Sequence, residues 1–289
     1  IQLSAKQLYI KGEALDNLLI DAQYQAQDST IYGASFNWHG AEISGQAEQF
    51  SQGWSLINVT VNKLDLPQNS SAEKLLSRLK SLDLPIYHIN SLDLLSSNLH
   101  YAGWQFNHLD ASLENLTLDR PLWQQEQGYI SFDAESVDFD QLRFIAPTAK
   151  LGFTQNRISV DEFDTDFKQG RVQLSGILTP EDVALNRLKI TGVKWLEQTD
   201  QLISTLAQMS QPLHSLKIAE LDIENAQLIQ VERPPYWQLS GLNIEGQELT
   251  LIHDDQVGLY DGSLEISANN ASIEQLLTTQ AVLKASAKQ

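Results

Sequence analysis

Alternation of apolar and polar residues dominates this chain. At 92–94 an aspartate stands between two leucines, and the same pattern recurs at 59–61, 130–132, 172–174, 188–190 and 221–223. Successive side chains of a strand point to opposite faces of its sheet, so each segment has one apolar and one polar face. Turn residues such as Asp254-Asp255 and Asn269-Asn270 interrupt the pattern at short intervals. We therefore predict a mostly β protein with an elongated, twisted antiparallel sheet.

Three segments have a helical pattern instead. Ser70 and Glu73 form a capping box, and leucines at 75, 76, 79 and 82 continue the helix that it predicts. A second helix is predicted over about 195–209, and a short third one over 272–277. We expect these few short helices at the edges of the sheet.

An internal repeat relates the two halves of the chain. Segment 104–118 begins with Trp-Gln and ends with Leu-Thr-Leu, and segment 237–251, which lies 133 residues further on, begins and ends in the same way. Two further pairs of segments match at nearly the same spacing: 89–94 with 218–223, and 128–134 with 262–268. The matches predict two tandem repeats, residues 1–138 and 139–289, within one continuous domain.

Both repeats also share an irregularity. Apolar residues at 59 and 61 are followed by apolar residues at 64 and 66, and in the second repeat the positions are 188 and 190, then 193 and 195. Such a change of parity predicts a β-bulge or bend that turns the strand. We therefore expect a curved unit whose apolar face forms a groove.

Charge excludes one class of ligand. Nineteen Lys and Arg stand against 37 Asp and Glu, which gives a formal net charge of −18. Nucleic-acid binding requires basic clusters that neutralise phosphates, and the closest spacing of basic residues, Lys74, Arg78 and Lys80, reads as a solvated helix face. No apolar run of 18 residues occurs, so this segment by itself has no predicted membrane span, and no signal peptide is visible.

The residues give no basis for an enzyme, a cofactor or a metal site. The chain has no cysteine, which excludes a thiolate metal site, a thiol nucleophile and a disulfide. Its six histidines are scattered, and it contains neither a Gly-rich phosphate loop nor a Gly-x-Ser-x-Gly elbow. The acidic run Asp161–Asp166 suggests calcium but lacks the Gly and distal Glu of an EF-hand loop, and its alternation favours an exposed strand.

A group of four carboxylates resembles an acid–base pair on paper. Its members are Asp133, Glu135, Asp138 and Asp140, and their counterparts in the second repeat are Ser267, Asn269, Ser272 and Glu274. The repeat keeps its apolar positions and varies these acids, which favours a solvated face over a catalytic site.

Several segments resemble the AsmA family of bacterial envelope proteins. They include Trp237-Gln-Leu-Ser-Gly-Leu, Leu249-Thr-Leu-Ile-His-Asp-Asp, Gly262-Ser-Leu-Glu-Ile-Ser-Ala and Gly170-Arg-Val-Gln-Leu-Ser-Gly. The resemblance covers most of the chain. It implies a protein anchored in the inner membrane by a segment outside this chain, with a long β-rich body in the periplasm. It further implies a link to outer-membrane assembly and the carriage of phospholipids along an apolar groove between the two membranes.

The leading hypothesis is thus a β-groove that holds or conducts phospholipid or another acyl-chain lipid. We expect its lining to consist of alternating apolar residues and their repeat counterparts: Val59, Val61, Leu92, Leu94, Leu116, Leu118, Ile130, Phe132, Leu188, Ile190, Leu221, Ile223, Leu249, Leu251, Leu264 and Ile266. The alternative is a scaffolding module that binds envelope protein partners, with these residues closed into a core. A third hypothesis, an enzyme on envelope glycan, has only tryptophans and scattered carboxylates in its favour. Trp104 and Trp237 occupy equivalent repeat positions, which favours a structural role for them.

Overall fold

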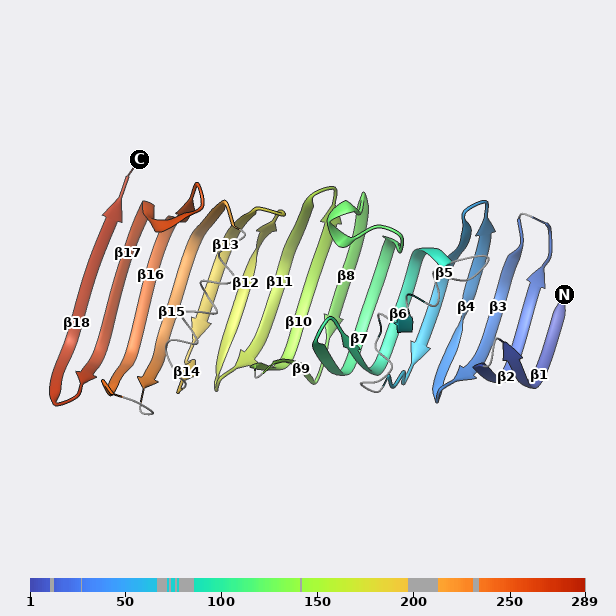
Figure 1. Ribbon diagram of the computed structural model, residues 1–289, viewed down its shortest axis with the longest axis horizontal. Coiled ribbons are helices and arrows are strands. Elements are labelled where there is room, and N and C mark those ends of the chain that lie inside the picture. The colour runs from blue at the N-terminus through green and yellow to red at the C-terminus, as the bar shows by residue number, and fades with distance from the viewer. Residues whose placement is uncertain are drawn as a thin grey trace. The chain divides into compact units, whose positions relative to one another are not determined.

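The chain is mostly β-strand and divides into two compact units, residues 1–155 and 156–289. Figure 1 shows this computed structural model, in which strands follow one another along each unit. The structure describes residues 1–10, 13–26, 28–66, 72, 74, 75, 77, 86–140, 142–196, 213–230 and 234–288.

The first unit is one sheet of ten strands with a short 3-10 helix, η1. The elements are β1 (Gln2–Ile10), β2 (Glu13–Gln23), β3 (Thr30–Trp38), β4 (Ala41–Phe50), β5 (Gly53–Asn62), β6 (Ile86–Tyr101), β7 (Trp104–Thr117), η1 (Leu122–Gln124), β8 (Gln127–Asp133), β9 (Ser136–Phe139) and β10 (Leu142–Thr154). Each strand from β1 to β7 pairs with the next one in the chain. Strands β8 and β9 both pair with β7 on one side and β10 on the other.

The second unit is a sheet of the same kind. Its elements are β11 (Arg157–Phe167), β12 (Gly170–Leu178), β13 (Asp182–Thr191), β14 (Lys194–Trp195), β15 (Ser215–Gln230), β16 (Trp237–His253), β17 (Gln256–Ile273) and β18 (Leu276–Ala287). The longest strands, β15 to β18, lie side by side in chain order (Figure 1).

Both sheets are mixed, so the prediction of a purely antiparallel sheet was wrong. Strand β5 runs parallel to β6, and β13 and β14 run parallel to β15. Hairpins join antiparallel strands, whereas parallel neighbours require a longer crossover connection. Residues 63–85 provide the crossover between β5 and β6, and residues 196–214 follow β14 in the second unit. Apolar and polar residues alternate in the same way in parallel and antiparallel strands, so the alternation does not indicate the direction of a strand.

The three predicted helices have different outcomes. In the first segment, Ala72, Lys74, Leu75 and Ser77 are α-helical, and the other residues from 70 to 82 lie outside the described residues. In the second, Trp195 belongs to β14, and 197–209 lie outside the described residues.

The third helix prediction, over 272–277, was wrong. Ser272 pairs with Leu277 in a hairpin between β17 and β18, and Glu274 at its tip has a φ of 50°. The hairpin gives cross-strand partners to eleven of the twelve residues of β18. A helix of one or two turns is only marginally stable and cannot compete with that pairing.

Left-handed residues recur at the repeat spacing. Pairs of residues with positive φ lie 129 or 133 positions apart: Asn17 and Ala146, Lys63 and Gly192, Ser96 and Asn225, His108 and Gly241, and Asn115 and Glu248. The bend expected after positions 61 and 190 therefore has a left-handed residue in each repeat, at Lys63 and Gly192. L-residues rarely adopt this conformation, so its recurrence marks a shared strand shape rather than chance alternation.

The same hydrogen bonds hold these bends in both repeats. The backbone N–H of Ser96 donates to Oδ1 of Asp110 at 2.6 Å, and that of Asn225 donates to Oδ1 of Asn243 at 2.8 Å. At the next bend, backbone N–H groups of Lys63 and Gly192 each donate across to the parallel neighbour at 2.8 Å. Backbone donors freed by the bulges thereby find acceptors within the sheet.

Candidate functional site: an apolar sheet face

Two rows of apolar residues cross the sheet of the first unit. Residues paired directly across strands carry their side chains on the same face, so the pairing defines each row. One row has one residue from each of nine strands: Leu3, Ile20, Ala34, Gly45, Val59, Leu92, Leu113, Ile130 and Leu151. The second row lies two residues away on the same face: Phe36, Ile43, Val61, Leu94, Ala111, Phe132 and Ala149.

The second unit repeats this arrangement. Its first row consists of Phe163, Leu174, Leu188, Leu221, Gly246, Leu264 and Ala285. Its second row consists of Val172, Ile190, Ile223, Ile244, Ile266 and Leu283. No polar side chain interrupts either row, so each unit has a continuous apolar band running across its strands.

The opposite face is polar throughout the same region. Between the two rows of the second unit, the paired residues are Gln173, Lys189, Asp222, Glu245, Glu265 and Lys284. The ammonium of Lys189 binds Asp222 at 2.9 Å and Glu224 at 2.8 Å, and these hydrogen bonds, the one to Glu224 above all, raise the pKa of Lys189. The sheet is therefore two-sided, with ion pairs on one face and aliphatic side chains on the other.

Fourteen of the sixteen predicted lining residues lie in cross-strand rows. Twelve belong to the rows above, and Leu116 and Leu249 pair with Ile89 and Ile218 in a third, shorter row. Leu251 packs against the cluster around Leu249, and Leu118 follows the end of β7. The rows also contain residues that precede the predicted ones on β7 and β16 and that the prediction did not name: Ala111, Leu113, Ile244 and Gly246.

Burial differs among the predicted lining residues. Leu116, Leu221 and Leu249 are buried, with exposed fractions of 5%, 8% and 1%. The other thirteen are half-buried, and none is fully exposed. Cross-strand neighbours about 5 Å apart cover one another's flanks, so half-burial is what a sheet face without a second layer gives.

The extent of exposed surface supports a single-layer arrangement. The chain exposes 17259 Å². Two compact domains of half its mass would together expose about 15,000 Å². In the second unit, the buried cluster of Ile218, Leu221 and Leu249 packs only against other strand residues, as far as the described residues go. In the first unit, helical Ala72 and Leu75 pack on the apolar cluster around Leu64 and Leu99, so that part of the face is covered.

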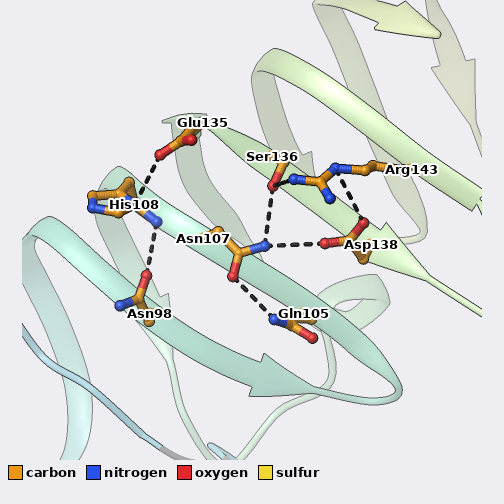
Figure 2. Close-up of polar contacts among 8 residues, drawn as sticks. All are labelled: Asn98, Gln105, Asn107, His108, Glu135, Ser136, Asp138 and Arg143. Carbon is orange, nitrogen blue, oxygen red and sulfur yellow. Dashed lines mark hydrogen bonds and ion pairs between the residues drawn. The ribbon is translucent and has the colours of Figure 1, made fainter.

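Figure 2 shows a polar network on β7, β9 and β10. The amide of Asn107 donates to Ser136 and to Asp138, both at 3.0 Å, and accepts a hydrogen bond from Gln105 at 3.0 Å. The guanidinium of Arg143 lies 3.7 Å from Asp138. These side chains partner one another across three strands, so the network fixes the strands in register.

Two of the four carboxylates singled out in the sequence, Glu135 and Asp138, have different partners. Glu135 lies 3.0 Å from Nδ1 of His108, whereas Asp138 binds Asn107 and Arg143 (Figure 2). Each of these two carboxylates has its own partner, and the residues face the polar side of the sheet. In the second repeat, Gln238 donates to Ser240 at 2.6 Å, and these two residues occupy the positions of Gln105 and Asn107.

The acidic run Asp161–Asp166 forms part of strand β11, as its alternation predicted. Asp164 receives two hydrogen bonds from Arg171, at 2.7 and 2.6 Å, and one from Gln173 at 2.9 Å. The bond from Arg171 is the main cause that holds the pKa of Asp164 below its usual value of 3.8. Among the described residues, no three His, Asp or Glu side chains are grouped as metal ligands.

The tryptophans of the repeat have equivalent positions. Trp104 begins β7 opposite Phe139, and Trp237 begins β16 opposite Ile273. The ring of Trp104 stacks on Phe139 with centroids 4.3 Å apart. Trp104 thus packs against an aromatic ring at the start of strand β7, which agrees with a structural role.

These features define a class of protein: a two-sided β-sheet with one long apolar face. The AsmA family matches this chain over residues 1–289, and the chain belongs to that family. It is similar to the AsmA family protein YicH of Escherichia coli (strain K12), with 24% identity over 96% of this chain. The chain spans 49% of the length of that relative. Family membership, expected from the sequence, is confirmed and indicates an envelope protein.

The described residues contain no helix of the length and apolar character needed to cross a membrane.

Proposed function

We propose that the apolar sheet face of each unit holds acyl chains of phospholipids and helps to conduct them between the inner and outer membranes. In this proposal the chain is the periplasmic part of a protein anchored to the inner membrane by a segment outside it. The observation that carries the proposal is the unbroken apolar row across seven strands of the second unit, from Phe163 to Ala285, with a row of polar residues beside it on the other face.

The dimensions of the rows suit an acyl chain. Neighbouring strands lie about 4.8 Å apart, so seven strands give a row of about 29 Å. One leaflet of a bilayer has a hydrocarbon depth of about 15 Å, half of the core thickness. Each row is therefore longer than an acyl chain and could carry one along its length.

Energetics favour occupation of such a face. Each methylene removed from water contributes about 0.8 kcal/mol, and a bare apolar band on a soluble surface is costly. A lipid lying along the rows would cover the half-buried side chains and lose its own contact with water. Because the rows are chemically uniform, a chain could also slide along them without breaking specific bonds.

The test compares two neighbouring positions of β17. Leu264 belongs to the apolar row and pairs with Gly246, whereas Glu265 points to the polar face and its carboxylate lies 2.8 Å from Lys284. A photocrosslinking amino acid is placed at each position, and the protein is irradiated with vesicles of phosphatidylethanolamine and phosphatidylglycerol. We expect lipid adducts from position 264 and few from 265. Equal lipid labelling at the two positions, or crosslinks at position 264 to protein and none to lipid, would contradict the proposal and favour a scaffolding role.

A further inference from the structure

A buried indole N–H that has no acceptor among the described residues lies at one end of the second unit. Nε1 of Trp195 is buried, and no described residue accepts its hydrogen bond; among described side chains it is alone in this respect. A buried donor that lacks an acceptor loses its hydration without compensation. Such a group in a native protein points either to strain or to a ligand that supplies the acceptor.

The repeat shows that this indole is not required by the scaffold. The counterpart of Trp195 in the first repeat, 129 residues earlier, is Leu66, which is buried in the apolar cluster. Trp195 pairs with Leu228 of β15, and the counterpart of Leu228 is Leu99 of the same cluster. Trp195 thus takes a position that belongs to the apolar face, and adds a donor to it.

A cation lies beside this donor. The ammonium of Lys168 stands over the ring of Trp195, 5.1 Å from its centroid, and the ring of Phe167 lies 6.1 Å away. In the first repeat the tryptophan is Trp38 at the end of β3, which corresponds to Phe167 of β11, and its N–H is satisfied: Nε1 of Trp38 donates to Glu13 at 3.2 Å. In the second repeat, a donor without an acceptor among the described residues thus lies beside the ammonium of Lys168, whereas the donor of the first repeat binds a carboxylate.

Backbone contacts fix the relative positions of these groups. The N–H of Lys194 donates to the carbonyl of Lys168 at 2.9 Å, which ties β14 to the turn between β11 and β12. At Gly170, a Cβ atom would lie 2.3 Å from the backbone of Thr191 and of Val193, so the turn is packed tightly against that segment. Donor and cation are thus preorganised, which reduces the entropy lost on binding.

We propose that Trp195 and Lys168 bind the anionic oxygen headgroup of an acyl amphiphile, with its chain on the apolar face. This inference rests on the proposed function and names its ligand class. An anionic oxygen would accept the Nε1–H and lie near the ammonium, and hydrogen bonds to charged groups are the stronger ones. In a chain of net charge −18, a local cation is needed to offset repulsion of such a ligand.

The experiment titrates the whole chain by calorimetry with three probes: oleate, a short-chain phosphatidylglycerol and the neutral dodecyl maltoside. Trp195→Phe removes the N–H and keeps the ring, and Lys168→Met removes the charge and keeps the stem. Lys194→Met, an exposed neighbour, is the charge-matched control. We expect Trp195→Phe and Lys168→Met to weaken the anionic probes about tenfold, with the neutral probe and the control unchanged. Whichever anionic probe binds identifies a carboxylate or a phosphate as the headgroup.

Melting of the free protein checks that the variants fold. Trp195→Phe removes part of the indole as well as its N–H, so a fall of a few degrees reports lost packing and not a lost hydrogen bond. Equal binding of anionic probes by wild type and Trp195→Phe, with dodecyl maltoside still bound, overturns this inference alone. Failure of all three probes to bind wild type overturns the proposed function as well.

Discussion

The side chain of Leu249 lies directly over Gly246, three residues earlier in the same strand. A Cβ atom at Gly246 would come within 2.5 Å of Cδ1 of Leu249 and within 3.2 Å of Cβ of Leu221. Leu249 is 1% exposed and has no free space to move into. We expect Gly246→Ala to lower the free energy of unfolding by about 1–3 kcal/mol through overpacking. Urea denaturation measures the change.

Gly33→Ala is the matched control for this prediction. Gly33 also lies within a strand, but a Cβ atom there would meet nothing within 4 Å. The alanine reduces the freedom of the unfolded chain, so we expect a gain of about 0.4–1 kcal/mol or no change. Equal effects of the two substitutions would show that the contact between positions 246 and 249 does not constrain the sheet.

A second prediction concerns the bend at Ser96. Its N–H donates to the side chain of Asp110, and the second repeat uses Asn243 for the same purpose. Asp110→Ala leaves this N–H without an acceptor, and we expect a loss of about 1 kcal/mol. Asp110→Asn keeps the acceptor and relieves repulsion from Asp133, which pairs with Asp110 across the sheet. Thermal unfolding should therefore show Asp110→Asn at least as stable as wild type, and a loss as large as that of Asp110→Ala would contradict the role of the oxygen.

Alternation in the sequence is enough to place Val59, Leu92 and Ile130 on one face, because side-chain direction in a strand has a period of two. It carries no information on strand order or direction. The parallel pairing of β5 with β6 depends on where the crossover returns the chain, which is a tertiary property. Likewise, Ser272 followed three residues later by Gln275 is locally compatible with the start of a helix, and only pairing of Ser272 with Leu277 decides for a hairpin.

The predicted lining residues leave out positions next to a reversal of the alternation by the backbone. Asn115 and Glu248 are left-handed, with φ of 57° and 52°. Because of such bends, Gly246 and Leu249 contribute to the same face although they are an odd number of residues apart. The predicted lining followed the alternation of Leu116 and Leu118 and therefore did not include Leu113, which lies an odd number of residues before them. The parity change between Leu113 and Leu116 is visible in the sequence and could have shown the bend.

Acid unfolding provides a third prediction. Hydrogen bonds from Arg171 lower the pKa of Asp164, so the folded state favours the carboxylate. Stability from this pair is fully present above the usual pKa of 3.8 and is lost as the pH falls through the lower value of the folded state. Asp164→Asn should therefore be less stable than wild type at pH 7, and the difference should shrink below about pH 4. Asp161→Asn, an exposed position of the same strand with the same change in charge, is the control. Parallel pH profiles of the two variants would show that only net charge matters.

The last prediction compares a buried and a half-buried position of the apolar face. Leu249 is buried, whereas Ile266 is half-buried in the row that crosses β15 to β18. Leu249→Arg places an unpaired charge where water cannot reach it, which costs several kcal/mol and should unfold the second unit. At Ile266 the long stem of an arginine can lie along the apolar row with its guanidinium in water, so the melting temperature should fall by only a few degrees. Circular dichroism melts of both variants measure the difference. If Ile266→Arg unfolds the protein as Leu249→Arg does, the row is a closed core and not a surface on which an acyl chain can lie.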